Sequence, residues 1–255
     1  MLFKTKILST ILLILIVYRS FSQEVADSSV FATMFSASYM YQIPDGDIAT
    51  RFGANSNIGG SFMVKFKSNI ILGVEWNSFF GNKLKEEATS IFDAIKTSTG
   101  DIIDQNGEYA TILLSERGFF TGVKAGKIFP VLFGVNNNSG LFISGSLGLL
   151  QHKIRIENDG NRAPQILNDF KKGYDKLTNG LAVSEFIGYM YIGESQILNF
   201  YAGFEFYQAW TQSRRDFDFG TMQVDTQKRL DMLHSFKIGW VIPLYKRLPD
   251  KYYYF

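Results

Sequence analysis

The chain has 255 residues, and its 26 lysines and arginines against 24 aspartates and glutamates leave a net charge of +2, which excludes the strongly basic surface of a nucleic-acid-binding protein. It has no cysteine, which excludes disulfides, thiolate metal sites and a cysteine-linked lipid. Aromatic residues at 16% and 23 glycines, against 5 prolines, favour a strand-rich protein.

The first 22 residues have the order of a secretory signal peptide. Lys4 and Lys6 precede an apolar run over 7–18, and the small residues Ser20 and Ser22 follow it. An uncleaved membrane anchor is the weaker reading, because a spanning helix needs about 20 apolar residues. We therefore predict a signal peptide over 1–22, cleaved after Ser22, and an N-terminal periplasmic segment over 23–30.

Eight later segments alternate apolar and polar side chains with the period of a β-strand. In one of them, Phe200 and Phe204 fall on one side, while Asn199 and Glu205 fall on the other. No later window is long and apolar enough for a spanning helix, so a membrane-crossing form must be a closed sheet. The segments are 31–42, 57–67, 70–81, 118–129, 141–152, 181–193, 197–210 and 233–245.

Short and long links alternate between these segments, which is typical of outer-membrane barrels with tight periplasmic turns and longer outer loops. We predict an all-β fold, an eight-stranded antiparallel transmembrane β-barrel over 31–245 with four long outer loops and short periplasmic turns, and a C-terminal aromatic tail over 246–255. The predicted long loops are 42–56, 82–117, 153–180 and 211–230, and the short links are 67–69, 136–140 and 194–196.

Three features together resemble the small outer-membrane β-barrel proteins of Bacteroidota: the signal ending at Ser20 to Gln23, the strands that alternate glycine and aromatic residues, and the terminus Tyr252–Phe255. The resemblance extends over the whole mature chain, but it is one of pattern, so it implies fold and location and no active site. Some barrels of that kind are accessory subunits of envelope machines, including secretion machines. The resemblance thus implies a similar role here.

Charged residues recur at positions predicted to face the barrel interior. An eight-stranded barrel is only wide enough for side chains, so such charges are expected to pair into a network that plugs the lumen. The alternative is a proton or ion relay, which intramembrane ionisable groups often form. The predicted interior network contains Lys65, Glu75, Lys124, Glu185, Glu205 and Lys237.

No catalytic, cofactor or metal site is predicted. The histidines, His152 and His234, lie near predicted strand ends and have no acidic helix motif beside them. A lipid-acting enzyme would need a nucleophile and a base within reach of each other, and Ser235 beside His234 is the one adjacent pair. Neighbours along a strand point to opposite faces, so we expect that the protein is not an enzyme.

Two surface features could contact other molecules. The last long loop alternates arginines with aromatic residues, which protein interfaces favour, although it could equally be a solvated hairpin with self-neutralising charge. An aromatic residue at the end of the last strand or at the end of the tail could be read by the barrel-insertion machinery, belong to an interfacial belt, or help to dock a partner. The candidate contact residues are Arg214, Arg215, Phe217 and Phe219, and the candidate insertion signals are Tyr245 and Phe255.

These features favour a non-catalytic outer-membrane barrel that acts as a scaffold or accessory subunit of an envelope complex. The expected partners are outer-membrane lipids, another envelope protein and the barrel-insertion machinery, without nucleic acid or a cofactor. A barrel that transports or binds a small solute is the first alternative. A lipid-modifying enzyme that acts through His234 or Ser235 is the second.

Overall fold

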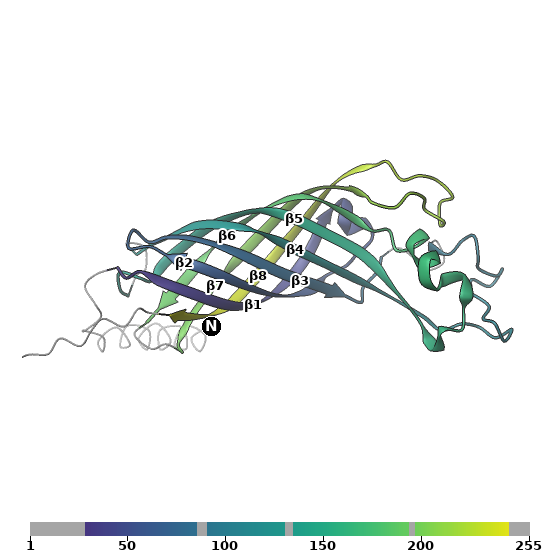
Figure 1. Cartoon of the computed structure of the whole chain (residues 1–255), viewed down its shortest axis with the longest axis horizontal. Coiled ribbons are helices and arrows are strands. Elements are labelled where there is room, and N and C mark those ends of the chain that lie inside the picture. Colours follow the sequence, from purple (N-terminus) through teal and green to yellow (C-terminus); the bar gives the residue numbers. More distant parts are fainter. Residues whose placement is uncertain (1–28, 86–90, 131–134, 194–196, 245–255) are drawn as a thin grey trace, which may run out of the picture.

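The computed structural model describes residues 29–85, 91–130, 135–193 and 197–244. Each of its eight antiparallel strands pairs with its neighbours in sequence, and the first pairs with the last, so the sheet is a closed barrel (Figure 1). The predicted strand number and direction are confirmed. The strands are β1 (Ala32–Gly46), β2 (Asn55–Lys65), β3 (Ile70–Gly81), β4 (Ile112–Phe129), β5 (Gly140–Asn158), β6 (Thr178–Ile192), β7 (Asn199–Ser213) and β8 (Lys228–Leu244).

Several strands continue further toward the long loops than predicted. β1 stays paired with β8 as far as Gly46, and only a short link with a 3-10 helix, η2 (Asp47–Thr50), leads into β2, so the predicted long loop over 42–56 is wrong. The hairpin of β4 and β5 extends beyond the rest of the barrel (Figure 1), because its pairing continues to Ile112 and Asn158.

Alternation along the strands separates an inward set of side chains from an outward one. The outward set is mostly apolar and exposed over the middle of the strands, which is the reverse of the usual water-facing surface. We call this surface the apolar belt: Phe35, Tyr39, Ile58, Phe62, Leu72, Val74, Trp76, Val123, Ile143, Leu147, Leu149, Leu181, Ile187, Phe200, Phe204, Phe206, Phe236, Ile238, Trp240 and Ile242.

The interior holds two apolar clusters. The cluster nearer the short turns consists only of residues such as Phe142, Phe186 and Val241 that lie on strands. The cluster nearer the long loops joins inward strand residues to buried loop residues, so the loops are packed into the barrel mouth as a cap. The loop members of this outer cap are Ile48, Phe52, Ile91, Phe92, Ile102, Ala163, Ile166 and Tyr174.

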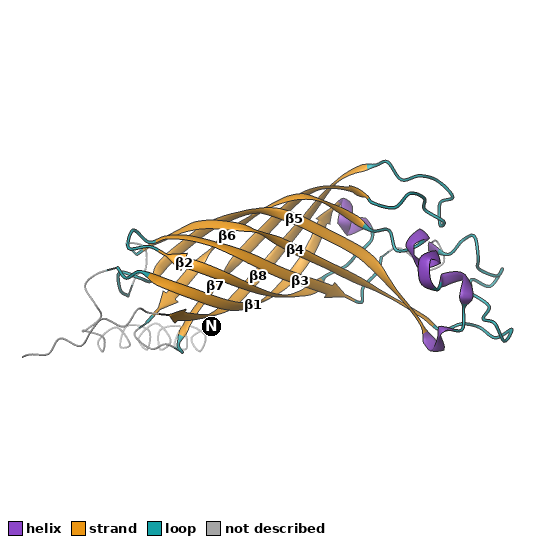
Figure 2. Ribbon diagram, in the orientation of Figure 1, coloured by secondary structure: helices purple, strands orange, loops and turns teal. Residues whose placement is uncertain are grey.

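The cap is built from irregular chain and single helical turns. Three 3-10 helices, η3 (Asp159–Asn161), η4 (Pro164–Ile166) and η5 (Asn168–Gly173), lie together at the long-loop end (Figure 2). Within the described ranges, no helix is long and apolar enough to cross a membrane. The signal peptide over 1–22, most of the segment over 23–30, Tyr245 and the tail over 246–255 lie outside the described residues.

Replacing Phe52 by alanine tests the outer cap. Phe52 is 1% exposed, and its ring lies 5.6 Å from that of His152, so its removal leaves a cavity. We expect the free energy of unfolding to fall by about 3–5 kcal/mol, measured by urea titration of the refolded protein. The matched control is Phe170→Ala at the exposed surface of η5, which should cost less than about 0.5 kcal/mol. Equal losses would contradict a packed cap.

Candidate functional site

Between the two apolar clusters lies a layer of four buried charges, which we call the charge layer: Glu75, Lys124, Glu205 and Lys237. The ammonium of Lys124 lies 2.7 Å from Glu75 and 3.8 Å from Glu205. That of Lys237 lies 2.6 Å from Glu205 and 3.6 Å from Glu75. Each cation thus faces both carboxylates, and the layer is neutral.

Hydroxyl groups complete the layer. Ser146 donates a hydrogen bond of 2.5 Å to Glu75, and Ser184 donates one of 3.2 Å to Glu205. A buried charge is tolerated only where it is paired and hydrogen-bonded, and both conditions are met here. Tyr207 packs on the side of the outer cap, and Phe142 belongs to the cluster on the other side. The described part of the lumen is therefore filled with side chains.

The structure corrects two members of the predicted network. Lys65 is fully buried but belongs to a separate site near the short turns, where its ammonium donates to Ser29 at 3.0 Å, to the Val30 carbonyl at 3.1 Å and to Asn138 at 2.9 Å. It therefore holds the chain before β1 against the β4–β5 turn. Glu185 is exposed on the outer face of β6, so the predicted inward position was wrong.

A second buried polar group, near the outer cap, was not predicted from the sequence. Nε2 of His152 lies 2.9 Å from a carboxylate oxygen of Asp231, and the Thr211 hydroxyl donates 2.5 Å to the same oxygen. Both His152 and Asp231 are 1% exposed. The hydroxyl contacts the carboxylate and not the imidazole, so the group does not have the order of a nucleophile, a base and an orienting acid.

The other histidine faces outward. His234 lies 3.2 Å from Asp45 at the long-loop end of the wall, whereas Ser235 points inward and accepts a hydrogen bond of 3.1 Å from Gln42. The two side chains lie on opposite faces of β8, as predicted. Among the described residues, no group of three or more His, Asp or Glu side chains could hold a metal ion.

Most of the predicted contact residues bind other parts of the same chain. Arg215 binds Asp175 through two hydrogen bonds of 2.7 and 2.5 Å, and Arg214 donates 2.5 Å to Asn179. The Phe219 ring lies 5.4 Å from that of Tyr174 in the outer cap. Arg215 and Phe219 therefore fasten the last loop to the loop between β5 and β6, and Arg214 fastens it to the start of β6. Of the four candidates, only Phe217 keeps an aromatic ring at the surface with 37% exposure.

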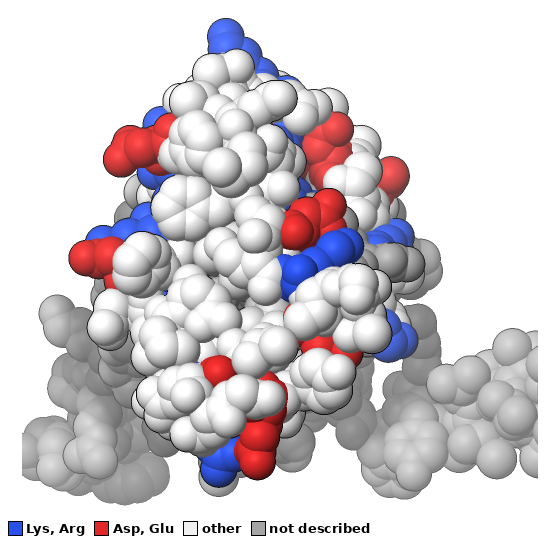
Figure 3. All heavy atoms as spheres, turned by 90° about the vertical axis from the view of Figure 1, so that its right-hand side faces the viewer, with Lys and Arg blue, Asp and Glu red and all other residues white. Residues whose placement is uncertain are grey.

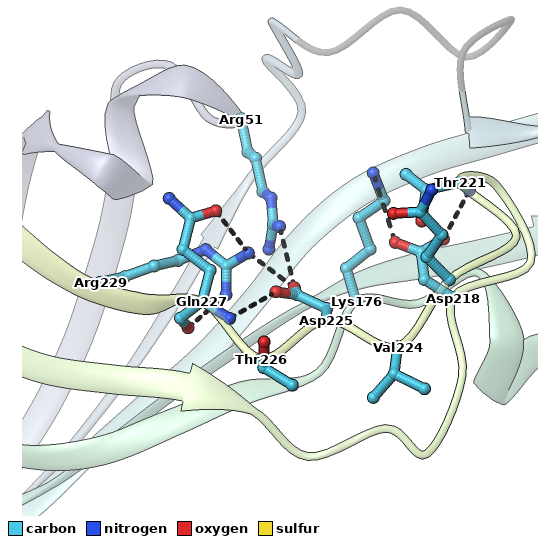
Figure 4. Close-up of a pocket in the computed structure, with 10 residues that line it drawn as sticks. Arg51, Lys176, Asp218, Thr221, Val224, Asp225, Thr226, Gln227 and Arg229 are labelled. Atoms are coloured by element: carbon cyan, nitrogen blue, oxygen red, sulfur yellow. Dashed lines mark hydrogen bonds and ion pairs between the residues drawn. The ribbon is translucent and has the colours of Figure 1, made fainter.

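A cavity of about 430 Å³ opens beside this loop (Figure 4). Asp225 accepts a hydrogen bond of 2.6 Å from Arg229 and lies 3.9 Å from Arg51, and Lys176 lies 4.0 Å from Asp218. Each cation in the lining thus has a carboxylate beside it. Figure 3 shows the same mixture of acidic and basic residues over the loop end of the molecule, so the face has no preference for one sign of ligand charge.

Replacing Lys237 by methionine tests the charge layer. The variant leaves Glu205 buried without its nearest cation, and we expect it to lose about 3–5 kcal/mol of unfolding free energy. The control, Lys127→Met at an exposed position, should change stability by less than about 0.5 kcal/mol. The double variant Glu205→Gln with Lys237→Met should lose less than the sum of the single changes. Additive losses in urea titrations would show that the pair is not coupled.

Lowering the pH tests the loop ion pairs. Burial raises the pKa of Asp225, but hydrogen bonds from Arg229 and from the Gln227 amide outweigh it and hold the pKa below its ordinary value of 3.8. A depressed carboxylate pKa stabilises the fold above the ordinary value and ceases to do so as the pH falls through the folded value. We expect amide hydrogen exchange over 221–230, corrected for intrinsic rates, to rise between about pH 4 and pH 2.

Two variants serve as controls for that measurement. Asp225→Asn should exchange faster at neutral pH already and show no further acid step, whereas Asp216→Asn, at an exposed position of the same loop, should behave like the unmodified protein. An acid step that persists in Asp225→Asn would assign the transition to another group.

Comparison with known proteins yields similarities of shape alone. No protein-family model matches the chain, and no curated protein does. Neisserial surface protein A shares 11% identity over 82% of this chain and 96% of its own, with a TM-score of 0.42. Ail, the attachment invasion locus protein of Yersinia pestis, shares 9% over 83% and 98%, with a TM-score of 0.42. The N-terminal beta-barrel domain of Pseudomonas aeruginosa OprF shares 11% over 81% and 97%, with a TM-score of 0.34.

Proposed function

We propose that this chain is exported by its signal peptide and inserted into the outer membrane, where it acts as a sealed, non-catalytic scaffold or accessory subunit of an envelope complex. The apolar belt is the observation that carries the membrane location. It surrounds a closed barrel whose backbone groups are paired from strand to strand, and such a surface is stable in lipid and aggregates in water.

The filled interior supports a role other than transport. A conducting barrel needs a water-filled lumen, but the charge layer and the outer cap occupy the lumen of this one. A small-solute transporter is therefore the weaker candidate. With the lumen sealed, the surfaces available for function are the outward wall, the outer loops and the two terminal segments.

The polar groups of the structure support a non-catalytic role. His152 bonds to Asp231 inside the packed outer region, and His234 and Ser235 lie on opposite faces of the wall. Neither histidine has a serine or threonine hydroxyl as a hydrogen-bond partner in the described ranges. A lipid-modifying enzyme built on either histidine would lack an activated nucleophile.

We base the proposed partner within the envelope on the resemblance to Bacteroidota barrels. That partner could belong to a secretion machine. Another envelope protein, outer-membrane lipids and the insertion machinery are the proposed contacts. Tyr245 and Phe255 keep their proposed role as insertion signals. Both lie outside the residues that the structure describes.

Affinity purification tests the proposed role. The chain, tagged within an exposed loop at Gly107, is recovered from detergent-solubilised outer membranes and its co-purifying proteins are identified. We expect one or more envelope proteins in a constant ratio to the barrel, and none in a parallel purification of an unrelated tagged barrel. Recovery in the water-soluble fraction would contradict the membrane location, and recovery as a free monomer would contradict the accessory role.

A further inference from the structure

We propose that the outward wall around β5 and β6 is a docking surface for a membrane-spanning segment of a different protein, and that Glu185 is the ion-pair partner of a lysine or arginine on that segment. This inference rests on the proposed function and names the chemistry of the partner. It starts from a carboxylate that faces lipid instead of the barrel interior.

Glu185 lies in the middle of the apolar belt. The outward residues of β6 run from Asn179 at the long-loop end to Tyr191 at the short-turn end in steps of two, and Glu185 is the fourth of these seven positions. Its neighbours along the strand are Val183 and Ile187. Across the sheet it pairs in register with Gly145 on β5 and Phe206 on β7.

The Glu185 carboxylate has no partner within the part of the chain that the structure describes. It takes part in none of the hydrogen bonds and ion pairs there, whereas the charges of the interior layer are all paired. The outward residues beside it are apolar except Gln208 on β7, which lies diagonal to Glu185 and forms no hydrogen bond with it in the described structure. A charge that faces hydrocarbon alone is costly, and ionisable residues at such positions mark functional sites.

The outward side chains in the row beside Glu185 are also unusually small. Ala125 on β4, Gly145 on β5 and Glu185 on β6 follow one another in register, and all three side-chain positions face outward. The larger Ile143 and Leu147 flank Gly145 along β5. Small residues let the backbone of a neighbouring membrane segment approach closely, so this shallow depression brings a partner within reach of the carboxylate.

Charge complementarity identifies the occupant. In hydrocarbon, a carboxylate is best stabilised by a lysine or arginine at the same depth. A second copy of this barrel, inserted in the same orientation, does not supply one from its described wall. Its outward cations lie near the strand ends: Lys127 lies two residues from the end of β4 with its ammonium 5.5 Å from the Phe129 ring centre, and Arg117 and Lys153 lie at the long-loop end. Since the described wall of a second copy offers no such cation, we assign it to another protein.

Site-specific crosslinking in intact cells tests this surface. A photoreactive amino acid replaces Gly145 in the depression or, as the matched control, Ala37, which is a small outward residue on β1. Heat-modifiable migration in gels confirms that each variant folds. We expect a crosslink to a distinct membrane protein from position 145 and at least about tenfold less from position 37.

Exchange of the carboxylate separates partner binding from folding. Glu185→Gln and Glu185→Leu should each lower recovery of the partner about tenfold. Glu185→Leu should leave the barrel as resistant to urea as the unmodified protein, or more so, because it removes a charge from lipid. The control Gln208→Leu changes a polar outward residue of β7 and should leave partner recovery unchanged.

Three results would overturn the inference. Full recovery of the partner with Glu185→Leu, or equal crosslinking from positions 145 and 37, would exclude this surface while the accessory role stands. A crosslinked species of two copies of this chain would exclude a different protein as occupant. Failure of the proposed function would give a different result, because the unmodified barrel would then be recovered without any partner.

Discussion

The structure depends on one constraint: a backbone in hydrocarbon, which is the proposed environment of this barrel, must satisfy all its hydrogen-bonding groups internally. Pairing of β1 with β8, from Thr33 opposite Leu244 to Gly46 opposite Asp231, meets it by leaving the sheet without a free edge. Closure then divides the side chains of each strand into an inward set and an outward set, because successive residues point alternately to the lumen and to the surroundings. The apolar belt and the filled interior are the two results of that division.

The small circumference determines what the inside can be. Eight strands enclose a space that side chains fill, so polar groups there must satisfy one another. The charge layer does so with two cations shared between two carboxylates, and the outer cap closes the mouth above it with apolar side chains. The proposed function therefore uses the surface of the barrel, and Glu185 is a charged residue on the otherwise apolar middle of that surface.

Period-two alternation was enough to predict the strand number, the strand direction and most of the inward charges. It failed where a polar side chain faces outward or an apolar one faces the lumen. On β6 the outward Glu185 and the inward Phe186 contradict the rule that polar residues face the lumen, so the position of the glutamate was assigned wrongly. The extensions of β4 and β5 carry outward charges such as Lys153 and were predicted as loop.

Contacts between distant loops have no periodic pattern in the sequence. The packing of Phe52 against His152, and the pairing of Arg215 with Asp175, depend on how four separate hairpins meet at the barrel mouth. Local sequence carries little information about such contacts, and the loop arginines were accordingly predicted to face a partner.

Nitroxide scanning of β8 measures which side chains of the barrel wall face lipid. The chain has no cysteine, so single labels can be placed at successive residues from 234 to 242 after reconstitution into phospholipid vesicles. We predict that the collision rate of the label with lipid-soluble oxygen alternates with period two, high at Phe236, Ile238 and Trp240 and low at the positions between them. Access of a water-soluble nickel complex to the whole series, without alternation, would contradict it.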